Sequence, residues 1–340
     1  MQPNICGPHL RTLLILTLAL ATLATGSDAF ACAACDSTLS RDWETQGIST
    51  KSGFSADLSY NYLNQNQQRY GASKASGALI NNQLAAGQEV EAYTKTQTLT
   101  AVLNYTGDAF ALSIQLPFVN RTHGTYGATP PLGSNYATSS DNSIGDVRII
   151  SRYSGFSSEK TSGLIAGIKL PTGNTGATFS DGITPLDAGL QIGSGSTDLI
   201  LGGYTSGSIK EYSWFVQGTV QHAVATDMAM GGLAYRPGDA YTLNTGIRYA
   251  EFGAKITPML QLNIIKRQAD TGAFTVPLDP VTGVPISGGT LAYLAPGVSI
   301  RAGGGMSVYG FVQLPIYQSV NSLQLVPQYT LTLGVRQSFE

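Results

Sequence analysis

The stretch Phe54-Ser55-Ala56-Asp57-Leu58-Ser59-Tyr60-Asn61-Tyr62 alternates apolar and polar residues without a break. Successive side chains of a β-strand point to opposite faces, so one face of this stretch is apolar and the other is polar. The alternation therefore predicts a strand that lies between an apolar medium and water.

The same alternation recurs along the rest of the chain. Further apolar sets, mostly spaced by two residues, fall within 99–105, 110–118, 147–153, 164–170, 199–201, 212–220, 241–249, 260–264, 294–300, 308–316 and 329–339. With the first stretch they predict about 12 strands, and an even number is typical of bacterial outer-membrane barrels.

The connections between these strands alternate between short and long. The short ones are 106–108, 154–162, 205–208, 250–252 and 302–305, and the long ones are 64–91, 120–142, 172–195, 222–238 and 268–289, with a shorter one at 318–326. Outer-membrane barrels have short periplasmic turns and long external loops. The sequence thus predicts an all-β, antiparallel, up-and-down barrel in the cell outer membrane, over residues 54–340.

The composition agrees with a wall between lipid and water. Charged residues make up only 12% of the chain, and the net charge of −2 gives no basic footprint for nucleic acid. Apart from the N-terminus, no apolar run approaches the ~20 residues of a transmembrane helix. We expect a monomer in contact with outer-membrane lipid, without a cofactor.

The N-terminus has the features of a secretory signal peptide over residues 1–31. Arg11 precedes the apolar run Leu13–Leu23, and the small-residue site Ala29-Phe30-Ala31 follows. At the other end, Phe339 in phase with Val335 resembles the signal read by the outer-membrane assembly machinery, although Glu340 follows it.

Residues 32–53 form the predicted periplasmic segment, which opens with Cys32 and Cys35. In an oxidising periplasm two close thiols most simply form a disulfide. Capture of a transition metal would need more ligands than this pair supplies, and lipidation of Cys32 would need a better lipobox; both alternatives stay open. We expect the polar stretch 36–51 to fold into the lumen as a plug or gate.

Seven charged residues fall on the polar phase of their strands. They are Asp146, Arg148, Arg152, Lys169, Asp198, Arg248 and Arg267. A lipid-facing Arg or Lys costs about 2–4 kcal/mol at the bilayer midplane, so these side chains should face the lumen. There they would either pair and stiffen the barrel or form a constriction that selects permeants.

Three predicted outward strands carry the dipeptide Leu-Pro, at Leu116-Pro117, Leu170-Pro171 and Leu314-Pro315. Because proline cannot donate a ladder hydrogen bond, each is expected where pairing gives way to an external loop.

Two rival functions depend on the outer rim. His123 and His222, with Asp227 nearby, would suit a surface-facing barrel hydrolase, since such enzymes place histidines and carboxylates at the rim. Alternatively, the long loops 64–91 and 120–142 would bind a partner in a structural or adhesive barrel.

Several runs resemble a known family of outer-membrane proteins. Ile144-Gly145-Asp146-Val147, Lys169-Leu170-Pro171-Thr172-Gly173 and Gly195-Ser196-Thr197-Asp198-Leu199 resemble the family named for the meta-pathway of phenol degradation. The opening from Cys32 to Trp43 and the run Leu291–Gly297 resemble a largely uncharacterised branch described as candidate transporters. The resemblance implies a channel or transporter for small, hydrophobic or aromatic solutes, and it assigns no catalytic or binding residue.

Overall fold

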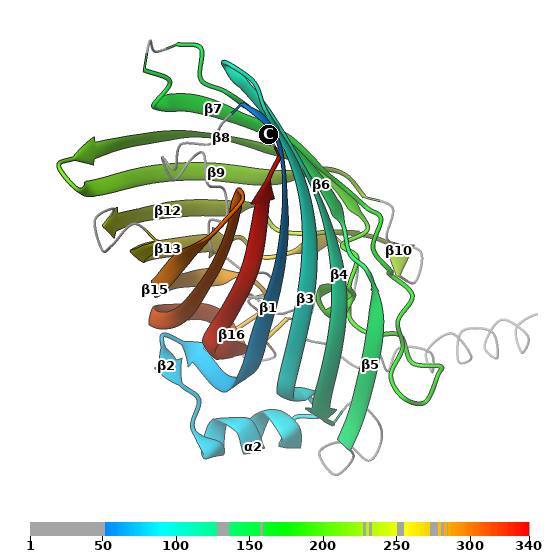
Figure 1. Cartoon of the computed structure of the whole chain (residues 1–340). Helices are drawn as coiled ribbons and strands as arrows, with labels where there is room; N and C mark the ends of the chain where they lie inside the picture. Colours follow the sequence, from blue (N-terminus) through cyan, green and yellow to red (C-terminus); the bar gives the residue numbers. More distant parts are fainter. Residues whose placement is uncertain are drawn as a thin grey trace, which may run out of the picture.

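The computed structural model is an antiparallel β-barrel (Figure 1). It describes residues 52–127, 136–156, 159–226, 229–230, 233–249, 255–272, 278–279, 282–283 and 285–339. Within these residues no helix is both long enough and apolar enough to cross a membrane. The predicted signal peptide, Cys32, Cys35 and the predicted plug 36–51 lie outside the described residues.

The main sheet of the described chain holds 13 strands. Those that form the barrel wall are β1 (Gly53–Gly71), β3 (Val90–Thr106), β4 (Phe110–Tyr126), β6 (Val147–Tyr153), β7 (Ser162–Leu170), β8 (Ser196–Ile209), β9 (Tyr212–Thr226), β12 (Ala240–Tyr249), β13 (Ile256–Arg267), β15 (Gly289–Gly303) and β16 (Met306–Ser338). Each pairs with its neighbours in chain order, and β16 closes the barrel by pairing with β1.

The last strand crosses the wall twice. The first half of β16 pairs with β15, the second half pairs with β1, and the chain reverses near Ser322, whose φ is 55°. The Ser338 amide donates to the carbonyl of Gly305, 3.0 Å away, and thereby joins the two ends of this hairpin. Counting β16 twice, the 11 strands make 12 passes (10 + 2), so the predicted strand number is confirmed.

The remaining elements lie outside the closed wall. β2 (Ser73–Lys74) extends the outer end of β1, and β5 (Tyr136–Ile144) pairs with β4 alone. Helix α2 (Gly77–Ala85) begins at Ser76, whose hydroxyl accepts a hydrogen bond from the Leu79 amide. β10 (Ala229–Met230), β11 (Leu233–Arg236) and β14 (Thr271–Gly272) form a small separate sheet.

The wall is apolar outside and polar inside. Leu58, Leu164 and Leu201 are 50%, 56% and 59% exposed, whereas Gln261 and Asn263 inside are at most 1% exposed. A soluble protein buries leucine and exposes amides, so this reversed pattern is that of a wall surrounded by lipid. At the end of the barrel with the tight turns, outward aromatic rings pair, as Tyr212 and Tyr249 do at 5.1 Å.

Short and long connections alternate where the chain is described, but several boundaries differ. Residues 318–326, expected as a loop, belong to β16, and the turn expected at 250–252 lies outside the described residues. Residues 64–71 and 120–126 belong to β1 and β4, and 136–142 to β5, rather than to external loops. Beyond the membrane both faces of a strand meet water, so the alternation disappears although the backbone still pairs. The turn expected at 205–208 is also strand, and the chain turns at Lys210-Glu211.

The prolines of the three Leu-Pro pairs lie either just after a strand or where strand pairing changes. Pro171 ends β7 as predicted, but Pro117 and Pro315 lie inside β4 and β16. Pro117 falls where β4 changes partner from β6 to β5, and Pro315 falls at a register shift between β15 and β16. At each site the ladder to one neighbouring strand is interrupted, so a residue without an N–H is tolerated there.

Candidate functional site

The connection between β7 and β8, residues 171–195, lies against the inner wall of the barrel. Its apolar side chains Ala177, Phe179, Leu186 and Leu190 form a small buried cluster of their own. The cluster includes part of the single helical turn η1 (Ala188–Leu190). A loop with its own core holds a defined shape, so it is an element of the lumen rather than a loose strap.

A turn at Asp181 shapes the outer tip of this loop. The Asp181 carboxylate accepts hydrogen bonds from the Thr184 hydroxyl and from the backbone amides of Ile183 and Thr184. These bonds, that of the Thr184 hydroxyl first, hold the pKa of the Asp181 carboxyl below its ordinary value. Nearby, the Ser180 amide donates to the Thr138 carbonyl, which ties the loop to the free edge of β5.

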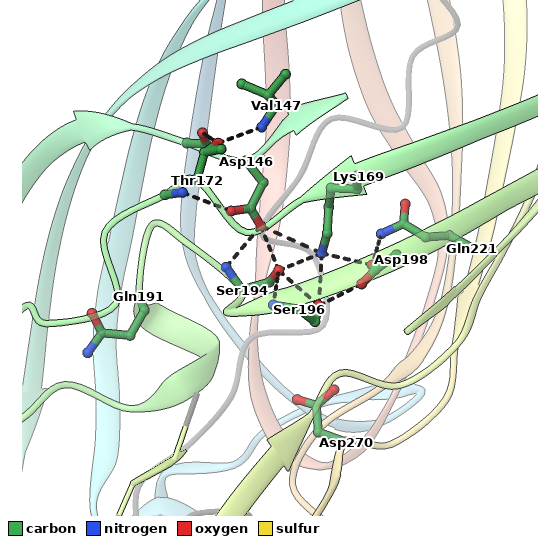
Figure 2. Close-up of polar contacts among 12 residues, drawn as sticks. Asp146, Val147, Lys169, Thr172, Gln191, Ser194, Ser196, Asp198, Gln221 and Asp270 are labelled. Carbon is green, nitrogen blue, oxygen red and sulfur yellow. Dashed lines mark hydrogen bonds and ion pairs between the residues drawn. The ribbon is translucent and has the colours of Figure 1, made fainter. Parts of the chain in front are cut away.

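One carboxylate clamps both ends of the loop. Asp146, between β5 and β6, accepts a hydrogen bond from the Gly173 amide through Oδ1 (3.0 Å). Its Oδ2 accepts from the amide (3.0 Å) and the hydroxyl (2.6 Å) of Ser194. Because Gly173 lies near the start of the loop and Ser194 near its end, Asp146 draws the two ends together. Figure 2 shows the contact between Asp146 and Ser194.

Lys169 supplies the positive charge that faces the carboxylates of Asp146 and Asp198. Its Nζ lies 2.8 Å from Asp198 Oδ2 and 3.6 Å from Asp146 Oδ2, and it also donates to the Ser194 and Ser196 hydroxyls (Figure 2). Between 3% and 10% of these three charged side chains is exposed. A buried pair of this kind is costly to break, because removing one partner leaves an uncompensated charge.

Arg121 of β4 holds the last part of the loop, just before Ser194. Its Nη1 donates to the carbonyls of Leu190 (3.0 Å) and Gln191 (2.9 Å), and its Nε donates to the Thr96 hydroxyl. The Gln191 side chain in turn bonds to both backbone groups of Ala177. The loop is therefore fixed at its two ends by Asp146 and at residues 190–191 by Arg121; we call these contacts the loop latch.

A cavity of about 230 Å³ lies in the lumen beside the latched loop. The wall contributes residues from β1, β3, β4, β6, β7, β8, β9, β12, β13 and β16, and the loop contributes residues from Ala188 to Ser194. The cavity is therefore enclosed by the barrel wall together with the inserted loop. For scale, an apolar cavity of about 150 Å³ is large enough to bind benzene.

Solved structures with this architecture come from outer membranes. An outer membrane channel from Pseudomonas putida F1 matches 86% of this chain and 97% of its own, with 11% identity and a TM-score of 0.56. The Ralstonia pickettii toluene transporter TbuX (93% and 100% covered, 10% identity) has a TM-score of 0.43, and the translocator domain of the autotransporter NalP from Neisseria meningitidis (85% and 90%, 10%) has one of 0.46. The chain has the fold of an outer-membrane barrel. No family model matches the chain, and no match was found among curated proteins.

Five of the seven charged residues predicted to face the lumen line the cavity: Asp146, Arg148, Lys169, Asp198 and Arg267. The structure brings Asp146, Lys169 and Asp198 into one cluster, while Arg267 lies 3.5 Å from Asp270. Arg152 and Arg248 lie nearer the tight-turn end of the barrel, one residue before the ends of β6 and β12.

Arg121 was not among the site residues predicted from the sequence. Residues 120–142 were expected to form an external loop, where an arginine has no assigned face. The available signal was the inward phase of β4, since Val119, Arg121 and His123 alternate with outward residues and are all buried.

The two histidines expected at the outer rim differ from each other in exposure. His123 is fully buried; its Nδ1 lies 2.9 Å from the Thr94 hydroxyl, and its Nε2 lies 4.0 Å from Glu89. His123 thus lies near the outer end of β4, as expected, but it is buried rather than surface-facing. His222 is exposed and contacts Asp239 and Arg236, while Asp227 lies outside the described residues.

Proposed function

We propose that this barrel is an outer-membrane channel for small solutes and that the loop 171–195 forms its constriction. The observation that carries the proposal is the cavity between the wall and the loop, because a permeant must pass a space of about 230 Å³ rather than an open bore. Barrels of ~16–18 strands leave an aqueous channel, whereas 12 passes leave a lumen that one loop can obstruct.

The lining of the cavity supports small solutes with an apolar body. Leu63, Val119 and Ile265 come from the wall and Ile192 comes from the loop, so apolar surface faces the space from both sides. Ligand sites combine such surface with a few placed polar groups. Small hydrophobic or aromatic solutes, as the family resemblance implies, therefore fit the proposal.

The loop latch gives the channel two states in principle, one latched and one released. Its charged core is buried, so the latched state is the stable one in this structure. A permeant that competes for Arg121 or Lys169 would loosen the loop as it passes. The constriction is thus coupled to the groups that line the cavity.

A shortened loop tests the proposal. Residues 175–191 are replaced by a short Gly-Ser linker, and wild type and variant are compared in planar bilayers and in liposome swelling with sugars and one-ring aromatic solutes. We expect a clear rise in single-channel conductance and in the size limit for the solutes. If both proteins show the same conductance and the same size limit, the loop does not form the constriction; if neither passes any ion or solute, the barrel is not a channel.

A further inference from the structure

Three arginines face the lumen near the tight-turn end of the barrel. Arg152 and Arg248 are the penultimate residues of β6 and β12, and Arg336 lies two residues before the end of β16. Each has an outward-facing apolar or aromatic neighbour in sequence, namely Tyr153, Ile247 and Val335, which are 41–51% exposed. The alternation of the strands therefore turns all three guanidinium groups inward.

The three arginines are evenly spaced around the wall. In the strand order, four steps lead from β6 through β7, β8 and β9 to β12. Four more steps lead from β12 through β13, β15 and the first half of β16 to its second half, and four lead from there through β1, β3 and β4 back to β6. Arg152, Arg248 and Arg336 thus form a ring, which we call the arginine ring.

The ring carries a net positive charge. Among the described residues, the carboxylate on this part of the inner wall is that of Asp57, whose two oxygens lie 2.9 and 3.0 Å from the Tyr309 hydroxyl. By formal charge, the three guanidinium groups exceed the one carboxylate at this end of the described inner wall. Arg152 and Arg336 both lie near the tight-turn ends of their strands and face inward, so their charges act on the same end of the lumen.

The cavity lies on the outer side of this ring and has a lining of mixed chemistry. Arg121, Arg148, Lys169 and Arg267 outnumber Asp146 and Asp198 in it. Lysine and arginine rings favour anions in pores. Arginine also matches the planar fork of a carboxylate with two parallel hydrogen bonds. The apolar lining suits the body of a small organic molecule, and the ring beyond suits its charge.

We propose that the permeant is a small organic anion, namely a carboxylate on a compact apolar body, which the arginine ring draws from the cavity toward the periplasmic mouth. This inference rests on the proposed channel function and adds the substrate class to it. A neutral aromatic compound would gain the apolar contacts but not the electrostatic attraction, and an ammonium compound would be repelled.

The first test is the reversal potential in a potassium chloride gradient. Wild type is expected to prefer chloride over potassium. Each charge removed from the ring should lower the anion preference about twofold, since a unit charge about 8 Å away changes an anion-to-cation ratio by about that factor in a water-like dielectric screened by about 0.1 M salt. Arg152→Gln/Arg336→Gln should therefore lose about fourfold, whereas Arg152→Lys/Arg336→Lys should keep most of the preference.

Lys95→Gln is the matched control, because it removes the same charge from the exposed outer face of β3. It should leave the reversal potential unchanged. A wild-type channel that prefers potassium, or a double Gln variant with the wild-type preference, would overturn the arginine ring as a selectivity element. If the double Gln variant does not fold, Arg248→Gln alone, with an expected twofold loss, takes its place.

The second test does not depend on conduction. Binding of benzoate, benzyl alcohol and benzylamine to the detergent-solubilised wild-type protein is compared by calorimetry. Benzoate should bind at least several-fold more tightly than the two others, and the Gln double variant should lose this difference. If all three solutes bind equally tightly and all of them pass through the barrel, the anion inference is refuted but the proposed channel function stands. Selective benzoate binding without any flux would refute the channel and retain the anion site.

Discussion

Lys169 and Asp198 face each other across neighbouring strands, 2.8 Å apart and almost fully buried. This pair joins β7 to β8 immediately below the loop that connects the two strands. Through Asp146 the same lysine also holds the two ends of the loop, so one side chain links the barrel wall to the constriction. The position of the loop in the lumen therefore depends on charge balance at a single buried cation.

Replacement of Lys169 by methionine should release the loop. The substitution leaves Asp146 and Asp198 buried without their cation, and the loss of one partner from a buried pair costs about 3–5 kcal/mol. The barrel ladder remains intact, so we expect the cost to be relieved by local detachment of residues 173–194. Single-channel conductance should rise, and the loop should become sensitive to protease. Lys95→Met is the control, and wild-type conductance together with full protease resistance in Lys169→Met would rule out the latch.

Replacement of Arg121 by glutamine should weaken the same latch from the other side. The carbonyls of Leu190 and Gln191 lose their shared donor, and a buried group left without a partner costs about 1–3 kcal/mol. The single-channel conductance should rise, and its fluctuations should increase. Arg69→Gln is a matched control, since Arg69 also donates to a loop carbonyl, that of Ala72, but at an exposed site. If Arg121 and Lys169 act on one loop, the effects of the double variant should be smaller than the sum of the single effects.

Two glycines of the loop offer a steric test. A Cβ on Gly193 would lie 2.3 Å from the Gly173 carbonyl oxygen, whereas a Cβ on Gly176 would have nothing nearer than 3.6 Å. Gly193→Ala should therefore force the two ends of the loop apart and raise the conductance, and Gly176→Ala should behave like wild type. Equal conductance of the two variants would show that the close approach of Gly173 and Gly193 does not control the opening.

Much of the fold can be predicted because lipid imposes a simple rule on the sequence. Every apolar set found by its alternation, from Phe54–Tyr62 to 329–339, lies on a wall strand, except that Phe339 follows the end of β16. The rule stops at the membrane boundary, where Asn64–Gly71 and Asn120–Tyr126 continue as strand without alternation. Backbone pairing persists there because it needs only a partner strand, and the sequence contains no sign of that partner.

The site was predictable in part for a related reason. The inward face of Asp146, Lys169 and Asp198 follows from the alternation, and the opposition of Lys169 to Asp198 follows from the register of one hairpin. The inward fold of residues 171–195 does not follow from the alternation or the register, because it depends on the small core around Phe179 and on the distant Arg121. Such contacts join elements far apart in sequence, and no periodic pattern reports them.

The lipid-facing wall predicts a position-specific cost for a charge. Leu201 on β8 is 59% exposed on the outer face, so Leu201→Arg should destabilise the barrel in vesicles by about 2–4 kcal/mol if it lies near the bilayer midplane. Leu201→Phe keeps the position apolar and should change the free energy of unfolding little. Denaturant titrations followed by Trp214 fluorescence in lipid vesicles measure both. A Leu201→Arg variant as stable as wild type would mean that this face does not meet hydrocarbon.

Deletion of residues 32–52 tests the predicted plug. The segment is polar, precedes β1 at the tight-turn end, and is short enough to fold back into a lumen of 12 passes. If it obstructs the channel, its removal should raise the conductance, and Cys32→Ser/Cys35→Ser should give an intermediate rise should a disulfide hold the segment compact. The deletion should add to the effect of Gly193→Ala, since plug and loop would obstruct different parts of the lumen. An intact protein that already conducts with low resistance, and does so equally without residues 32–52, would show that the loop alone forms the constriction.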